Sequence, residues 1–225
     1  MTDPITLSSL AAIVRRFGAR NGERCARRQA DNRAIAGAGR EQLIRRILST
    51  IHNNSILLCG GSESGKKSIL QEIKNRLESG GDSNTEFFPV SIDLQGVPEH
   101  LAFATVADAV LGQLSFASPT KVERFGGSYG HRDLANDFRA VIRTLRESSV
   151  SEIRLVLLVE GIDELNTYHP RTTQRVRSLF MASLDGNLVM VATAVEIDKH
   201  WEQEGSPWYN FFEEIELSPR TGDST

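Results

Sequence analysis

The residues best suited to chemistry form a glycine-rich run with two lysines. Gly60 and Gly65 lie five residues apart, and Lys66 directly follows the second glycine. Glycine permits backbone torsions that bring the main chain close to an anion, and successive N–H groups then form an anion-binding nest. Lys66 would reach the terminal phosphates as a point charge. This spacing predicts a P-loop that binds the phosphates of ATP or GTP. Its candidate nucleotide-binding residues are Gly60, Gly61, Ser62, Glu63, Ser64, Gly65, Lys66, Lys67 and Ser68.

The sequence on both sides of this run supports a P-loop. Residues 55–59 are an apolar run bounded by turn residues, which predicts a buried strand. After the run, Ile69, Leu70, Ile73 and Leu77 recur at helical spacing. A helix that begins here directs its partly positive N-terminus at a bound anion. A plain glycine turn would also join a strand to a helix, but the complete context favours the phosphate site.

One residue departs from the P-loop pattern. The lysine of the motif is normally followed by a hydroxyl that ligates Mg²⁺, but here Lys67 stands at that position and Ser68 comes one place later. An ammonium group cannot ligate a cation. Magnesium binding is therefore in question, with Ser68 as the candidate hydroxyl ligand. A register shifted by one would make Lys67 the phosphate lysine and Ser68 the ligand, but it loses the glycine before the lysine, so we prefer the unshifted register. Lys67 is expected either to point outward or to supply part of the metal's charge at the phosphates.

A second candidate group follows the apolar run at residues 153–159, which predicts a strand buried on both faces. Glu160, Asp163 and Glu164 come where this strand ends. Carboxylates placed beside a phosphate loop can hold a metal ion and can orient or deprotonate an attacking water. The alternative is a purely structural role, in which these acids only cap the following loop.

Thr193 is a third candidate. It ends a predicted strand at residues 187–193, where its hydroxyl could hydrogen-bond a γ-phosphate or the attacking water. The five histidines have no metal-ligand spacing, so we interpret them as surface or packing residues.

Strands and helices alternate along the chain. Besides the segments above, the pattern predicts strands at residues 87–94 and 211–217 and helices at residues 41–51, 66–77, 99–114, 134–145 and 172–183. Pro89 favours an edge position for its strand. The alternation implies βαβ crossovers and a three-layer α/β sandwich around a parallel sheet.

Bulk composition is that of a soluble globular domain, with 40% hydrophobic and 24% charged residues. There is no run of 18 apolar residues and no apolar signal-peptide core, which argues against a membrane protein. Two distant cysteines, Cys25 and Cys59, suggest a reducing compartment, so we expect a cytoplasmic protein.

Charge is unevenly distributed. Residues 1–50 carry a net charge of +6 from ten arginines, whereas the whole chain carries −3. We divide the chain into a basic N-terminal arm and linker (1–39), a core (40–219) and a tail (220–225). The arginine-rich residues 15–46 could contact nucleic acid or an acidic partner. A solvated helix and linker is the favoured alternative, because no aromatic residues are interleaved for base stacking.

With these residues in view, residues 39–219 resemble the ATPase core of the STAND and Orc/Cdc6-like branch of AAA-type P-loop proteins. Beyond the P-loop, Gly39-Arg40-Glu41 resembles that group's leading motif, which lies close to the nucleotide base. Residues 90–96 resemble its second strand, and residues 206–219 resemble the stretch around its fifth. Glu160-Gly161-Ile162-Asp163-Glu164 resembles the Walker B motif of NACHT-like members.

The resemblance implies a five-stranded sheet ordered 5-1-4-3-2, ATP rather than GTP, and a role as a regulated switch. It implies that Glu160 and Asp163 are metal-associated acids and that Glu164 lies near the catalytic acid. Two positions depart from it: Glu160 stands where the family usually has Asp, and Lys67 replaces the hydroxyl. The sequence ends at residue 225, where the helical lid would begin. We therefore expect this chain, without its lid subdomain, to be either a fragment of a longer protein or a diverged stand-alone core.

Three functions stay open at this point. The first is an ATP-binding regulatory switch with slow or assembly-dependent hydrolysis, acting through protein partners or self-assembly. The second is a degenerate P-loop scaffold without hydrolysis. The third is a DNA-dependent, Orc-like ATPase that uses the arginine arm. A nucleotide kinase is disfavoured, since it needs convergent arginines over the phosphates and only Arg124 and Arg132 are nearby candidates.

Overall fold

The computed structural model describes residues 38–80, 84–115, 129–182, 186–196, 201 and 203–217. The predicted arm up to residue 37, most of the connector that contains Arg124, and the chain beyond residue 217 lie outside the described residues. The domain boundaries proposed from the sequence therefore stay predictions.

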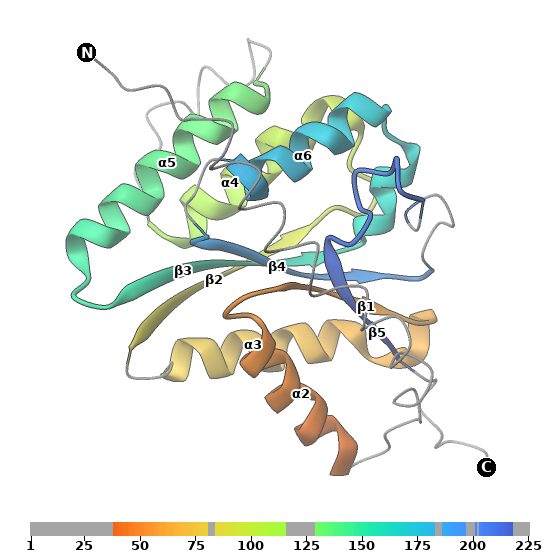
Figure 1. Ribbon diagram of the computed structural model, residues 1–225, viewed down its shortest axis with the longest axis horizontal. Coiled ribbons are helices and arrows are strands. Elements are labelled where there is room, and N and C mark those ends of the chain that lie inside the picture. Colours follow the sequence, from red (N-terminus) through yellow and green to blue (C-terminus); the bar gives the residue numbers. More distant parts are fainter. Residues whose placement is uncertain are drawn as a thin grey trace. The chain divides into compact units, whose positions relative to one another are not determined.

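Five parallel strands form one sheet in the order β2-β3-β4-β1-β5 (Figure 1). This is the predicted 5-1-4-3-2 order, which is thereby confirmed. β2 lies at an edge of the sheet, as Pro89 predicted. The strands are β1 (Ser55–Cys59), β2 (Thr85–Asp93), β3 (Glu152–Glu160), β4 (Leu188–Ala194) and β5 (Phe212–Glu216).

Helices cover both faces of this sheet, which confirms the three-layer α/β sandwich. α2 and α3 pack on one face, and α4, α5 and α6 on the other (Figure 1). Among the described helices, none combines the length and the apolar character needed to cross a bilayer. The α-helices are α2 (Ala38–Thr50), α3 (Lys66–Ser79), α4 (Ala102–Gln113), α5 (His131–Ser148) and α6 (Pro170–Ala182). Short 3-10 turns are η1 (Ser62–Ser64), η2 (Glu99–Leu101) and η3 (Ile162–Thr167).

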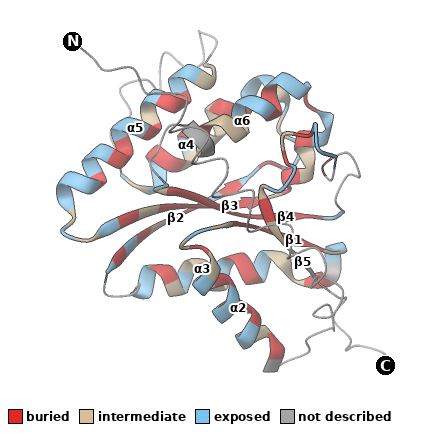
Figure 2. Cartoon of the chain, in the orientation of Figure 1, coloured by how far each residue is buried: buried red, intermediate tan, exposed pale blue. Residues whose placement is uncertain are grey.

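The central strands have apolar side chains on both faces, as parallel strands covered by helices require. In β1, Ile56 and Leu58 join the core beneath α2 and α3, whereas Leu57 and Cys59 join the core beneath α4, α5 and α6. Every residue of β1 and β4 is buried. Figure 2 shows the buried residues along the strands and on the helix sides that face the sheet.

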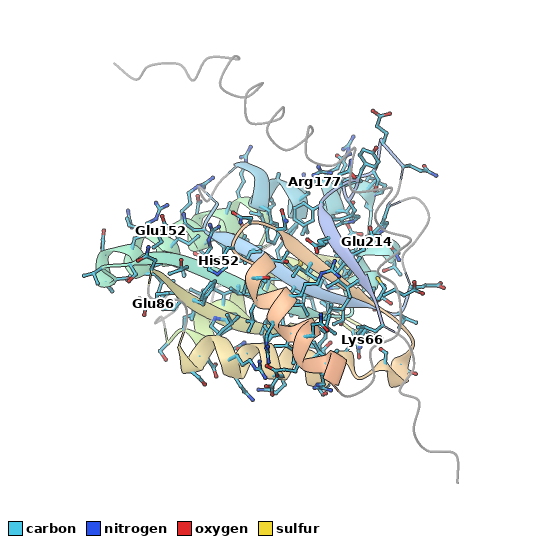
Figure 3. The ribbon with its side chains drawn as sticks, turned by 60° about the horizontal axis from the view of Figure 1, so that its bottom comes forward. His52, Lys66, Glu86, Glu152, Arg177 and Glu214 are labelled. Carbon is cyan, nitrogen blue, oxygen red and sulfur yellow. The ribbon has the colours of Figure 1, made fainter. Side chains whose placement is uncertain are left out.

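Parallel pairing brings the carboxyl ends of all five strands to one edge of the sheet. In Figure 3, Glu86 and Glu152, near the starts of β2 and β3, lie on one side, and Lys66 lies on the other. Cys59 ends β1 beside Ala194 of β4. The loop that follows β1, the turn that follows β3 and the end of β4 therefore share this edge.

Candidate functional site

Two positions in the loop between β1 and α3 require glycine. Gly60 has φ +156°, and a Cβ added there would lie 2.6 Å from the carbonyl oxygen of Leu217. Gly65 has φ +76° and directly precedes α3. Gly61, by contrast, has open space around its Cα. The chain thus turns sharply from β1 into α3, and the first turn of that helix leaves backbone N–H groups available at the loop.

Lys66 lies over this loop. Its ammonium donates to the carbonyl oxygens of Gly60 and Gly61, the latter at 2.8 Å, and to Ser64 Oγ at 3.3 Å. Partial burial lowers the pKa of Lys66, and the nearby Asp163 carboxylate opposes that effect. The ammonium therefore occupies the part of the loop where a P-loop lysine is expected. To hold a phosphate it has to exchange these carbonyl acceptors for phosphate oxygens.

Lys67 takes a different direction from Lys66. Its ammonium forms an ion pair with Glu160 Oε2 at 3.1 Å, which links the first turn of α3 to the last residue of β3. The Lys67 side chain is 79% exposed and that of Glu160 is 21% exposed. The two residues that depart from the family pattern therefore contact each other.

Ser68 contacts Arg40, a pairing that the sequence did not predict. Arg40 Nη2 donates to Ser68 Oγ at 2.5 Å. The helix predicted from residue 41 in fact begins at Ala38, so Gly39-Arg40-Glu41 forms its first turn instead of preceding it. The leading Gly-Arg-Glu motif was the available signal, but it indicated the nucleotide base as the neighbour, and nothing in it indicated α3.

Asp163 and Glu164 point to different neighbours. Gly161, with φ +68°, turns the chain from β3 into η3, which carries both acids. Asp163 Oδ2 accepts a hydrogen bond from the Val195 N–H at 3.2 Å, just after β4. Glu164 Oε2 accepts one from the Gly96 N–H at 3.1 Å, beyond the end of β2. Asp163 is thus the carboxylate nearer the phosphate loop, and the catalytic roles of both residues stay predictions.

Thr193 is buried inside the sheet at only 4% exposure. Its hydroxyl lies 3.4 Å from the Gly161 N–H and 3.5 Å from the Val159 carbonyl oxygen. It pairs in register with Leu58 of β1. The hydroxyl thus fixes the end of β3 to β4, and contact with a γ-phosphate stays a prediction.

Cys59 is not a candidate nucleophile. It is a buried free thiol at the end of β1, and burial raises its pKa to about 12. The thiolate is the reactive form, so Cys59 is inert at neutral pH.

Comparisons with known proteins find similarity at the level of structure. No family model and no curated protein matches the sequence. The ORC1 protein of Aeropyrum pernix, solved in complex with DNA, superposes with a TM-score of 0.55 and 14% identity over 81% of this chain and 46% of that one. A Walker-type ATPase of Pyrococcus abyssi superposes with a TM-score of 0.53 and 17% identity, over 79% of this chain and 53% of that one. Cdc6p of Pyrobaculum aerophilum superposes with a TM-score of 0.51 and 12% identity, over 80% of this chain and 45% of that one.

The chain has the fold of the Orc1/Cdc6 ATPase core. It spans about half the length of these proteins. The fold implied by the resemblance is therefore confirmed for its Orc/Cdc6-like part, whereas the finer STAND assignment has no support from these structures.

The resemblance implies a magnesium ion, but the residues present do not fit one. Mg²⁺ takes oxygen ligands in near-octahedral geometry, whereas an ammonium stands at the hydroxyl position and is paired with Glu160. The Ser68 hydroxyl is bound by Arg40. Within the described residues, no three His, Cys, Asp or Glu side chains form a group that could hold a metal ion. Each predicted metal ligand thus has another partner in this structure: Ser68 with Arg40, Glu160 with Lys67 and Asp163 with the Val195 N–H. Their metal-binding roles stay predictions.

Proposed function

We propose that this chain is the ATP-binding core of a regulatory switch of the STAND or Orc/Cdc6-like type. Its ATP hydrolysis is slow, or it depends on assembly with protein partners or with further copies of the chain. The protein acts in the cytoplasm. The observation that carries the proposal is the strand–loop–helix unit, in which Gly60 and Gly65 shape the loop and Lys66 lies over it. Loop N–H groups, the helix N-terminus and an ammonium together make a strong phosphate site.

Slow hydrolysis is supported by the contacts of the acidic residues. Glu164, the expected catalytic acid, bonds the Gly96 N–H, and Glu160 pairs with Lys67. A base must lie within hydrogen-bond reach of the water that it activates. Glu164 has to turn from Gly96 toward the loop before it can act on a bound nucleotide, and assembly is one way to drive that change. An ATP-bound form that persists until then is suited to a switch.

Titration with a fluorescent ATP analogue tests this function. We expect saturable binding, and we expect Lys66→Ala to raise the Kd about 30-fold, because it removes charge-assisted bonds worth about 2 kcal/mol. Lys74→Ala is the matched control, since it removes a lysine two turns along α3 that bonds Gln113. The control should stay within about twofold of the wild type. Absence of saturable binding, or an unchanged Kd for Lys66→Ala, would contradict the proposal.

A scaffold without hydrolysis is a second candidate, which the Lys67–Glu160 pair also favours. The two functions differ in what ATP does to the protein. A switch changes its assembly state or its contacts with a partner when ATP binds, whereas a scaffold does not. Analytical ultracentrifugation of the full chain with and without ATP separates them, with a phosphate-release assay run in parallel.

A DNA-dependent ATPase is a third candidate, because ORC1 of Aeropyrum pernix has a similar fold and was solved in complex with DNA. Of the arginine-rich residues 15–46, Arg40, Arg45 and Arg46 lie in the part of the chain that the structure describes. They donate to Ser68, Glu41 and Glu213, respectively. These three arginines thus have partners within the molecule. DNA binding would therefore depend on the arginines of the N-terminal arm.

A further inference from the structure

We infer that the ammonium of Lys67, held by Glu160, takes the place of the magnesium ion in this site, so that the chain binds a metal-free nucleoside triphosphate. The inference rests on the proposed function, because it concerns the nucleotide bound at the Gly60–Ser68 loop. It goes further by naming the ionic form of the ligand and the residue that replaces the metal.

The two consecutive lysines reach different parts of the site. Both lie in the first turn of α3, which begins at Lys66. Lys66 places its ammonium over the loop that follows β1, at the carbonyl of Gly61. Lys67 places its ammonium at the last residue of β3, 3.1 Å from Glu160 Oε2. Two positive charges therefore border the nucleotide site from different sides.

Glu160 lies where Lys67 can reach it, and its side chain is long enough to meet the ammonium. A glutamate reaches one methylene further than the aspartate usual at this position, and its carboxylate meets the ammonium directly. The fold gains little from this contact, because ion pairs this exposed contribute little to stability. The pair holds an ammonium at the end of β3, where the resemblance places the metal-associated acids.

The same ammonium makes this a poor place for Mg²⁺. A metal bound beside Lys67 would meet a like charge, and its hydroxyl ligand would be missing. Ser68, the hydroxyl one residue later, is held by Arg40. An ammonium instead offers three N–H donors and a compact positive charge to phosphate oxygens. An entering triphosphate can therefore share Lys67 with Glu160 and needs no metal to balance its charge.

Slow hydrolysis is a consequence of this arrangement. A metal ion neutralises charge that develops on the transferred phosphoryl group and helps to position the attacking water. Lys67 supplies positive charge but cannot coordinate a water as a metal does. The site would thus retain ATP and turn it over slowly, as the proposed switch requires.

The test compares ATP binding to the wild-type chain, by isothermal titration calorimetry, in excess Mg²⁺ and in excess EDTA. We expect the two Kd values to agree within about threefold. A Kd that is tenfold or more weaker in EDTA would overturn the inference while leaving the proposed function intact. Failure to bind ATP in either buffer would overturn both.

Variants identify the residue responsible. Lys67→Ala should weaken ATP binding in EDTA by about tenfold or more, because it removes the substitute cation. Lys67→Thr combined with Glu160→Asp restores the usual hydroxyl and aspartate, and should bind ATP at least about tenfold better with Mg²⁺ than with EDTA. Lys74→Thr, on the same helix, is the control and should stay indifferent to the metal. Circular dichroism verifies that each variant is folded. Unchanged binding of folded Lys67→Ala in EDTA would overturn the inference.

Discussion

Two of the three glycines in the loop between β1 and α3 are required by the backbone, and the third is not. Gly60 gives room for the backbone of Leu217, and Gly65 adopts the left-handed conformation that begins α3. Gly61 has neither constraint, with no atom within 4 Å of an added Cβ. The motif pattern does not distinguish these three residues, but their backbone environments do.

Alanine substitutions should separate these roles. Gly60→Ala and Gly65→Ala should each lower the free energy of unfolding by about 1–2 kcal/mol or more, because both impose a side chain on a backbone conformation that disfavours it. Gly61→Ala is the control and should change stability by less than about 0.5 kcal/mol. Urea denaturation followed by circular dichroism measures all three. A Gly65→Ala variant as stable as Gly61→Ala would contradict the positive φ.

The sequence predicted the glycines and Lys66 because their chemistry depends on local spacing. It did not predict the partners of the other side chains. Lys67 meets Glu160, which lies far along the chain, and Glu164 turns to Gly96 instead of the loop. Such contacts depend on strand order and on the rotamers of long side chains, and neither is encoded in a short motif.

At the scale of elements, α2 holds α3 in place and thereby positions the loop. Ile44 and Ile47 of α2 are buried in the core that α3 also lines. Glu41 accepts two hydrogen bonds from Arg76, at 2.9 and 2.5 Å, and a third from Arg45. Arg40 binds the first turn of α3 through Ser68. The first turn of α2 is thus attached to both ends of α3.

This attachment should depend on pH. Hydrogen bonding to Arg76, and then to Arg45, lowers the pKa of Glu41 from 4.5 to about 2. A lowered carboxylate pKa means that the ionised form stabilises the folded state, fully above pH 4.5 and progressively less as the pH falls toward 2. Glu41→Gln should therefore be less stable than the wild type at pH 7, and the difference should shrink between pH 4.5 and 2. Urea unfolding at several pH values measures this. Glu78→Gln, also on an exposed helix face, is the control, and a pH-independent difference for Glu41→Gln would contradict the assignment.

Element boundaries illustrate where sequence reasoning stops. The predicted strand boundaries lie within two residues of the observed ones at every end, because the apolar runs contrast with the flanking polar residues. The start of α2 was missed by three residues, since Ala38 and Gly39 carry no apolar signal. That first turn is fixed by contacts of Arg40 and Glu41 with α3, which are tertiary.

At the scale of the molecule, an aromatic cluster joins the segment before β5 to the rest of the core. Trp201 and Trp208 are both buried and lie 5.2 Å apart between ring centroids. Both pack on Phe212 of β5. Trp201 Nε1 also donates to Asn166 of η3, on the chain that carries Asp163 and Glu164. The cluster therefore links the outer strand to the turn after β3.

Removing one ring should destabilise the whole fold. Trp208→Ala should lower the free energy of unfolding by about 3–5 kcal/mol, the usual cost of truncating a large buried aromatic side chain. The adjacent Tyr209 is 37% exposed, and Tyr209→Ala should cost less than about 1 kcal/mol. Chemical denaturation of both variants measures the difference. Equal losses for the two would contradict the burial of Trp208.

Charge asymmetry leads to a further expectation at this scale. The chain beyond residue 50 carries −9, and the described arginines of α2 have partners within the molecule. We expect duplex DNA to bind weakly, if at all, at physiological salt, because affinity for DNA depends on free cations at phosphates. Fluorescence anisotropy with labelled duplex DNA measures this. Tight, strongly salt-dependent binding that is lost on deletion of residues 1–39 would instead favour the DNA-dependent ATPase.

In the proposed function, the Gly60–Ser68 loop holds the phosphates of ATP. A crystal structure of the chain grown with a non-hydrolysable ATP analogue tests it most directly. We expect phosphate oxygens bonded to the loop N–H groups at the N-terminus of α3, with the Lys66 ammonium moved from the Gly61 carbonyl onto a phosphate. A nucleotide bound elsewhere on the molecule, or one whose phosphates avoid this loop, would contradict it.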